Sequence, residues 1–248
     1  MNRLEIPKNH PRYESLVRRE RLLDFYQKGI VTVSGLISHG RGEAFDYLIG
    51  EKTQIFGYQA EMAAIDKIMR SKKPVISVNG NTAALAGKEI AEFAKRYNVT
   101  VEANIFYWSR ERMEQLVRYL ESLGVPALGL NQDALIPGLE SNRGKCESKG
   151  IFSADTVLIP LEDGDRAEAL KKMGKFTITI DLNPLSRTSR FGDITIVDDV
   201  QRAFTNLNNM KPDDYSGYSL TYDNSENTKI AIRFIAERLL NMKSWPEL

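Results

Sequence analysis

The densest group of chemically useful side chains lies between residues 175 and 190. Phe176, Ile178 and Ile180 alternate with threonines, which is the period-two pattern of a β-strand. Polar residues follow at once, namely Asp181, Asn183, Ser186, Arg187 and Thr188. They combine acceptors for a ribose or base edge with a guanidinium that donates to phosphate oxygens. The alternative is a polar turn in which Asp181 and Asn183 only bind neighbouring backbone.

A second polar turn leaves a strand pattern through Asn79, Gly80, Asn81 and Thr82 and enters a helix pattern. Backbone N–H groups at the start of a helix bind phosphate or carboxylate well. We therefore take Asn79, Asn81 and Thr82 as candidate substrate-binding residues, with Asn81 also a candidate catalytic residue. The alternative is that Asn81 or Thr82 only caps the helix.

A third group, His39-Gly40-Arg41-Gly42-Glu43, places an imidazole, a guanidinium and a carboxylate around flexible backbone. Arg41 is suited to phosphate or carboxylate oxygens, and His39 to proton exchange near neutral pH. We take both as candidate catalytic residues. The alternative for His39 is that it caps a helix or fills a gap in packing.

An acidic turn at Glu162, Asp163 and Asp165 follows another strand pattern and precedes a helix. Carboxylates at the end of a strand can gather Mg²⁺, but acidic residues also favour the first turn of any helix because they complement its dipole. Both interpretations stay open, and the metal ligands are unassigned.

The elements that must position these residues divide the chain into three parts. Residues 1–73 show helical patterns without a convincing strand, and the glycines at 40 and 42, at roughly 1 kcal/mol each, predict a break in the second helix. Residues 74–210 alternate strands with helices; the strand patterns are 75–79, 100–103, 127–130, 156–159, 176–180 and 193–197. Residues 211–248 predict a polar linker and a last amphipathic helix. We expect one compact α/β domain with a Rossmann-like parallel sheet, helices on both faces, a helical N-terminal segment and a C-terminal helical tail.

Composition excludes several classes of function. The chain has 248 residues and a formal net charge of +1, which gives no footprint for nucleic acid or an anionic membrane. The single cysteine, Cys146, excludes an internal disulfide framework and fits a reducing compartment. His10 and His39 are the only histidines, too few for a multi-histidine metal centre. No signal-peptide core and no run of eighteen apolar residues are present, so we expect a soluble, cytoplasmic protein.

Six blocks of sequence resemble the archaeal phosphopantothenate synthetases, which are the 4-phosphopantoate–β-alanine ligases of coenzyme A biosynthesis. The blocks are HPRYESLVRRE (10–20), GLISHGRGEAFDYLIGE (35–51), VISVNGNTAAL (75–85), IPGLE (136–140), PLEDGDRAEALKKMGK (160–175) and ITIDLNPLSRTSR (178–190). They occur in the order of the family and span most of residues 8 to 200.

The resemblance implies an ATP- and Mg²⁺-dependent ligase that acts as a homodimer. It would join 4-phosphopantoate to β-alanine and release 4′-phosphopantothenate, AMP and diphosphate. A carboxylate does not react with an amine at neutral pH until its oxygen becomes a leaving group, and adenylation makes that group AMP. Several phosphate charges then lie close together, which accounts for a need for arginine and Mg²⁺.

The resemblance also implies an ATP site. Its residues in this sequence are Arg19, Arg41, Asp181, Leu182, Asn183, Arg187, Thr188, Asp199 and Val200. Arg19 is preferred to its neighbour Arg18 because the family pattern reads Arg-Glu at this place. His39, Asn79 and Asn81 are assigned to the pantoate or phosphate side from their chemistry alone.

Two other functions fit a Rossmann-like core. One is an NAD(P)-dependent oxidoreductase. The absence of the glycine signature of dinucleotide-binding sites counts against it, because Gly40-Arg41-Gly42 is only a partial match and follows no strand. The other is a non-catalytic nucleotide-binding module. A P-loop is excluded, because six residues separate Gly80 from Gly87 and Glu89 follows Lys88.

Overall fold

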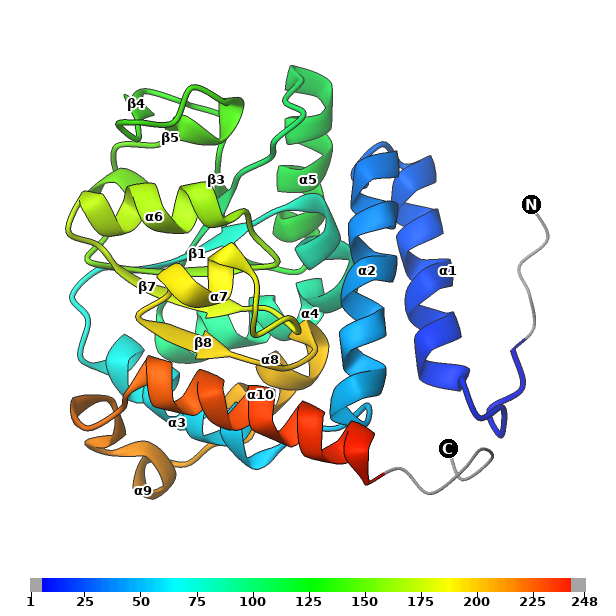
Figure 1. Ribbon diagram of the computed structural model, residues 1–248. Coiled ribbons are helices and arrows are strands. Elements are labelled where there is room, and N and C mark those ends of the chain that lie inside the picture. The colour runs from blue at the N-terminus through cyan, green and yellow to red at the C-terminus, as the bar shows by residue number, and fades with distance from the viewer. Residues whose placement is uncertain (1–5, 242–248) are drawn as a thin grey trace.

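A parallel β-sheet forms the centre of the protein, whose computed structural model describes residues 6–241. Its strands run in the order β3-β2-β1-β6-β7-β8, and every adjacent pair is parallel. Their bounds are β1 Pro74–Val78, β2 Thr100–Ala103, β3 Ala127–Leu128, β6 Thr156–Pro160, β7 Phe176–Ile180 and β8 Ile194–Ile196. The order reverses between β1 and β6, which makes that gap the topological switch point of a doubly wound sheet. The predicted Rossmann-like parallel sheet is therefore confirmed (Figure 1).

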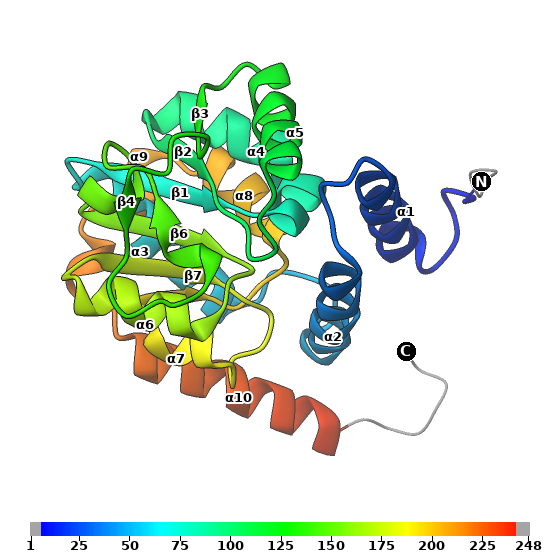
Figure 2. The same ribbon diagram turned by 90° about the horizontal axis from the view of Figure 1, so that it is seen from above.

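Helices cover both faces of the sheet. The main ones are α3 (Ile55–Met69), α4 (Gly80–Tyr97), α5 (Arg110–Ser122), α6 (Gly164–Lys172) and α8 (Val200–Asn209). The largest apolar cluster joins α3, α4, α5 and α8 to side chains such as Ile76 and Ile178, and a second cluster joins α6 to Val75 and Val157. Figure 2 shows α4 and α5 on one side of the sheet and α6 and α7 (Arg187–Phe191) on the other.

Burial on both faces explains the composition of the central strands. All residues of β6 are buried, as parallel strands covered by helices require. The polar residues of β7 are also buried. The hydroxyl of Thr179 can be buried because it donates a hydrogen bond to the hydroxyl of Thr195 on β8 at 3.0 Å. Two predicted strands are shorter than expected, and a small antiparallel pair, β4 (Ala134–Leu135) with β5 (Lys145–Cys146), was not predicted.

The predicted break in the second helix is wrong. α2 (Val33–Ile49) runs without interruption through Gly40 and Gly42, is capped by the Thr32 hydroxyl, and ends at Gly50 with a φ of 87°. Tertiary contacts outweigh the glycine cost, because α2 buries a carboxylate, Asp46, that binds arginines from α1 and α8.

The remaining elements close the edges of the fold. α1 (Tyr13–Gln27) and α2 form a hairpin beside the sheet, and α10 (Asn224–Leu240) lies along α3 (Figure 1). Between α8 and α10 the chain carries the short helix α9 (Pro212–Tyr215) and is tied to α3, where Asp66 accepts from the backbone of Gly217 and Ser219 at 3.0 Å. The three-part division of the chain stays a prediction, and residues 242–248 of its tail lie outside the described residues. None of the described helices is long and apolar enough to cross a membrane.

Candidate functional site

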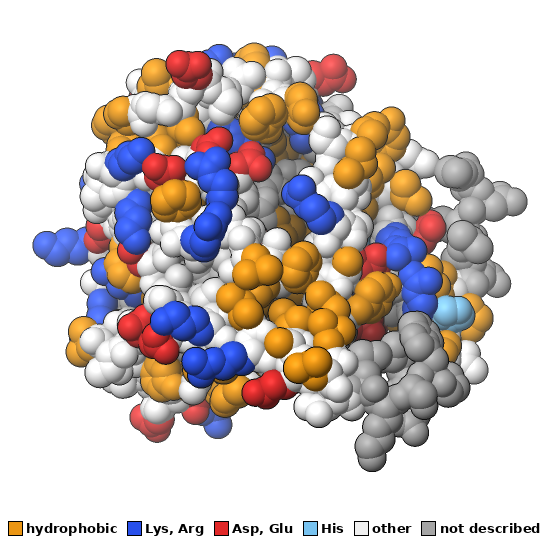
Figure 3. All heavy atoms as spheres, in the orientation of Figure 1, with side chains coloured by type: hydrophobic (Ala, Val, Ile, Leu, Met, Phe, Trp, Pro, Cys, Tyr) orange, Lys and Arg blue, Asp and Glu red, His pale blue; other side chains and the backbone are white. Residues whose placement is uncertain are grey.

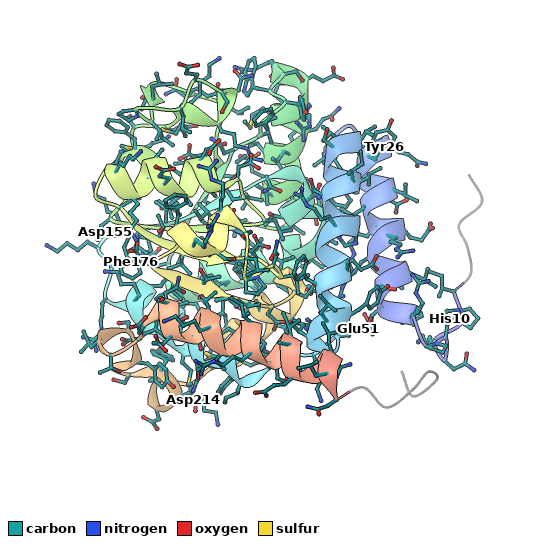
Figure 4. All side chains as sticks on the ribbon, viewed as in Figure 1. His10, Tyr26, Glu51, Asp155, Phe176 and Asp214 are labelled. Atoms are coloured by element: carbon teal, nitrogen blue, oxygen red, sulfur yellow. The ribbon has the colours of Figure 1, made fainter. Side chains whose placement is uncertain are left out.

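A cavity of about 460 Å³ opens at the carboxyl ends of the strands. Figure 4 labels Asp155 and Phe176 at the amino ends of β6 and β7, on the side away from α2, so the opposite ends of these strands point toward the α1–α2 hairpin. The cavity lies between those ends and the hairpin. Figure 3 shows a hollow in this face with basic side chains on both sides.

The end of β7 supplies Asp181, Leu182 and Asn183 to the cavity wall. Asp181 and Asn183 also bind neighbouring backbone, as the alternative of a polar turn predicts. Asp181 accepts from the Asn183 N–H at 2.9 Å, and Asn183 accepts from the Leu185 N–H at 2.9 Å. Burial raises the pKa of Asp181, while a hydrogen bond from Ser186 and the positive charge of Arg41 act in the opposite direction. The turn therefore holds these residues at the cavity, and the two interpretations are compatible.

α2 supplies His39 and Arg41 to the opposite wall. Within the described residues the Arg41 side chain makes no ion pair or hydrogen bond, and the buried Nε2 of His39 has no partner either. Burial lowers the pKa of His39, and nearby Arg18 adds to this effect. These two of the three predicted catalytic residues are therefore in the cavity wall, with the Arg41 side chain and His39 Nε2 free of hydrogen bonds in the described residues.

The structure separates the two neighbouring arginines of α1. Arg18 lines the cavity and binds Asp46 at 3.5 Å and Asp199 at 3.3 Å. Arg19 lies outside the lining, with 42% of its side chain exposed, and pairs with Glu43 at 2.6 Å. Asp199 and Val200, at the start of α8, both line the cavity.

Three other predicted residues also lie outside the lining. Arg187 on α7 is 55% exposed and pairs with Asp165 at 2.6 Å. Thr188 is buried and donates to the carbonyl of Glu162 at 2.7 Å, and Thr82 is buried and donates to Pro160 O at 3.1 Å. These three side chains stabilise the turns around the cavity.

The turn between β1 and α4 spans the switch point. Asn79 caps α4 by accepting from the Thr82 N–H at 3.0 Å, so the cap is neither Asn81 nor Thr82, and it donates to Leu161 O beyond β6 at 2.9 Å. Asn81 donates to Gly35 O on α2 at 2.7 Å and thereby links α2 to the sheet. Both asparagines line the cavity.

The acidic turn after β6 is engaged by arginines. Buried Glu162 binds both Arg143 and Arg166, whereas Asp165 lies in the first turn of α6 and pairs with Arg187. Across residues 6–241 no three His, Cys, Asp or Glu side chains are grouped to hold a metal ion. The three carboxylates of this turn are therefore not a preformed cation site.

Two arginines of the cavity wall, Arg112 and Arg143, were not predicted. Arg112 sits in the first turn of α5, where the sequence shows only an ordinary charged position beside the apolar stripe that starts at Met113. Arg143 comes from a short 3₁₀ helix, Asn142–Gly144, between β4 and β5. No local pattern distinguishes either residue from a surface arginine.

A doubly wound α/β sheet with a polar cavity across its switch point defines a Rossmann-type ligand-binding protein. The sequence profile of the phosphopantothenate/pantothenate synthetase family matches residues 56–238. The chain therefore belongs to this family.

Similar proteins extend the match to almost the whole chain. A protein of Thermococcus kodakarensis named 4-phosphopantoate--beta-alanine ligase is 47% identical over 96% of this chain and 95% of its own length. Proteins of the same name are 46% identical in Thermococcus onnurineus, over 96% of this chain and 95% of that protein, and 44% identical in Methanospirillum hungatei, over 96% and 99%.

Proposed function

We propose that this protein is an ATP-dependent ligase that condenses 4-phosphopantoate with β-alanine to give 4′-phosphopantothenate, AMP and diphosphate in coenzyme A biosynthesis. The observation that carries the proposal is the similarity to ligases of this name over 96% of the chain. A span of that length includes residues 18 to 200 and therefore every wall of the cavity. No finding favours an oxidoreductase or a non-catalytic module.

The nucleotide is proposed to bind at the ends of β7 and β8. Asp181, Leu182, Asn183, Asp199 and Val200 meet there in the cavity wall, and Arg41 faces them from α2. Arg19, Arg187 and Thr188 remain proposed contacts. For Arg187 this requires exchange of its contacts with Asp165 and Glu168 for phosphate, which costs little because such exposed ion pairs contribute only about 0–1 kcal/mol.

The chain's own residues can serve both steps of the reaction. Arg41 is proposed to stabilise the phosphate charge that develops while the carboxylate displaces diphosphate. Asn81 orients the acid, and His39 accepts the proton of the β-alanine ammonium through Nε2 before the amine attacks the adenylate and releases AMP. The lowered pKa of His39 keeps its imidazole neutral at neutral pH, as a proton acceptor must be.

Mg²⁺ is the metal that the family implies, and the cavity fits a mode of binding in which substrate phosphates provide most ligands. The carboxylate of Asp163 lines the cavity and is 59% exposed, and its contact with Arg143 Nε is long, at 3.3 Å. Asp163 is therefore our candidate protein ligand. Mg²⁺ bound there with ATP would neutralise phosphate charge.

A cytoplasmic homodimer completes the proposal. Figure 3 shows hydrophobic side chains gathered between α2 and α10, and the exposed residues of these helices include Tyr47, Leu239 and Leu240. A second copy would cover such a surface.

The test is a nucleotide assay with ATP, Mg²⁺, 4-phosphopantoate and β-alanine. The expected products are AMP and diphosphate, dependent on 4-phosphopantoate and Mg²⁺. ADP and phosphate would replace the acyl adenylate with an acyl phosphate, and a complete mixture without turnover would favour a non-catalytic module. Light scattering on a sizing column should give twice the chain mass of 28.1 kDa.

A further inference from the structure

Positively charged groups converge on the half of the cavity at the ends of β1 and β2. The contributors are Arg112 from α5, Arg143 from the segment before β5, and the amino end of α4. None of them belongs to the proposed nucleotide contacts at β7 and β8, which lie on the other side of the switch point. Arg143 also contacts Asp163, the proposed Mg²⁺ ligand.

Arg112 is fixed in place by neutral acceptors only. Its Nε and Nη2 donate to Ile30 O at 3.1 and 2.8 Å, and its Nη1 donates to Tyr107 O at 2.7 Å. Among the described residues no carboxylate pairs with it, and burial lowers its pKa. A partly buried cation held without a counter-ion costs free energy that an arriving anion recovers.

Arg143 adds a second guanidinium. It shares the fully buried carboxylate of Glu162 with buried Arg166, and its other carboxylate contact in the described residues is a long one, 3.3 Å from Nε to the exposed Asp163. Burial lowers the pKa of Arg143 to about 10, and the charges of Arg166 and Arg112 contribute to this shift, which shows that Arg112 and Arg143 are close enough to repel. The Nε of Arg143 is buried, and its contact with Asp163 does not have the geometry of a hydrogen bond.

The amino end of α4 lies directly against Arg112. A Cβ built on Gly80 would stand 3.2 Å from Arg112 Nη2 and 2.3 Å from Ile30 O, so only glycine fits here. Asn79 satisfies the N–H groups of Thr82 and Ala83, while those of Gly80 and Asn81 have no partner among residues 6–241. Unpaired N–H groups and the helix dipole favour an anion at this point.

We propose that this half of the cavity binds the terminal phosphate of 4-phosphopantoate, with Arg112 and Arg143 as the residues that select the phosphorylated acid over free pantoate. The proposal rests on the proposed ligase function. Four strand spacings of about 4.8 Å separate β2 from β8. This length of roughly 19 Å lets the two anionic substrates lie end to end, with the pantoate carboxylate directed toward the α-phosphate of ATP.

The first test replaces each arginine with glutamine. In Arg112→Gln and Arg143→Gln we expect KM for 4-phosphopantoate to rise about 10- to 100-fold, because each variant loses charge-assisted hydrogen bonds to the phosphate. In Arg112→Gln, KM for ATP should change less than about threefold, and in both variants the preference for 4-phosphopantoate over pantoate should fall. Arg118→Gln is the matched control, because Arg118 is on the same helix, 68% exposed and outside the cavity wall.

A merely structural role would not move the preference between the two acids. The proposed phosphate subsite would be contradicted if both variants kept the wild-type preference for 4-phosphopantoate. It would also be contradicted if both lost affinity for ATP and for 4-phosphopantoate equally. If Arg112→Gln does not fold, Arg143→Gln decides in the same way. Failure of the ligase proposal itself can be distinguished from failure of the subsite, because in that case the wild-type protein would form no AMP with either acid.

A second test needs no mutation and uses inorganic phosphate as the probe. Phosphate should inhibit the wild-type enzyme competitively with 4-phosphopantoate and not with ATP. Competition with ATP alone, or no inhibition at concentrations far above KM for 4-phosphopantoate, would contradict a preformed phosphate subsite.

Discussion

Arg41 lies in the cavity wall without any ion pair or hydrogen bond in the described part of the chain, so its charge is free for substrate. We expect Arg41→Ala to reduce kcat/KM about 10²-fold or more, roughly 3 kcal/mol. The melting temperature should barely change, because no contact is lost. Initial rates and thermal unfolding measure both quantities, with Arg110→Ala, at an exposed position of α5, as the control. A variant with wild-type turnover would remove Arg41 from the reaction.

Asn183 has two functions in our proposal, and they can be separated. Its side-chain oxygen holds the turn by accepting from the Leu185 N–H, and the residue lines the cavity where the nucleotide is proposed to bind. Asn183→Asp retains the oxygen and replaces the amide with a charge that repels phosphate. We expect ATP affinity to fall at least about tenfold, or about 1.4 kcal/mol, with apo stability within about 0.5 kcal/mol of wild type. Calorimetric titration that shows unchanged affinity would move the nucleotide to another strand end.

Among the helices, α2 carries a glycine that its conformation does not require. A Cβ on Gly40 would meet nothing within 4 Å, and the residue lies in regular helix outside the cavity wall. Gly40→Ala should therefore stabilise the protein by about 1 kcal/mol and leave activity unchanged. Chemical denaturation measures this change.

Gly50 provides the opposite case at the end of the same helix. Its φ of 87° is unfavourable for alanine, and a Cβ would stand 3.3 Å from the Arg238 guanidinium. Gly50→Ala should destabilise the fold by about 1 kcal/mol or more. Equal effects of the two substitutions would contradict the continuous helix.

The segment between β3 and β6 is held by a buried carboxylate at the end of β2. Glu102 accepts from the backbone N–H groups of Glu147 at 2.9 Å and Ile151 at 2.6 Å, and burial raises its pKa to about 7. Between the ordinary pKa near 4.5 and about 7, the folded state binds a proton that the unfolded state has released. The stability due to Glu102 is therefore present at low pH and is lost as pH rises through about 7.

This linkage predicts a difference between the wild type and Glu102→Gln. The unfolding free energy of the wild type relative to the variant should fall from pH 5 to about pH 7 and then level off, whatever the absolute stability of the variant. Denaturation curves across that range measure the difference. A difference that is constant with pH would mean that Glu102 titrates normally.

For the molecule as a whole, the local patterns predicted more of the strands than of the site. Runs of alternating or continuous apolar residues predict the strands, because each pattern is short and local. The order of the strands in the sheet depends on packing between distant segments, which a short stretch of sequence does not contain. Asp181 and Asn183 were predicted from their position after β7, where parallel strands direct their ends to one edge. Position after a strand does not predict Arg112 as a cavity residue. The carbonyls of Ile30 and Tyr107 hold its side chain in place, and Ile30 is distant from it in sequence.

The error at α2 has the same origin. Helix propensity counts the cost of two glycines but not the ion pairs of Asp46 with Arg18 and Arg202, which are made by other elements. Contacts between segments decided both the continuity of this helix and the composition of the cavity wall.

The α1–α2 hairpin contributes Arg18, His39 and Arg41 to the cavity, and all three precede residue 56, where the match to the family profile begins. A gene that encoded only the matched segment would still specify the sheet and α10. It would be counted among the synthetases in a genome survey, yet its product would lack one wall of the cavity. Inventories of coenzyme A enzymes should therefore require the histidine and arginine of α2 that correspond to His39 and Arg41, in addition to the profile.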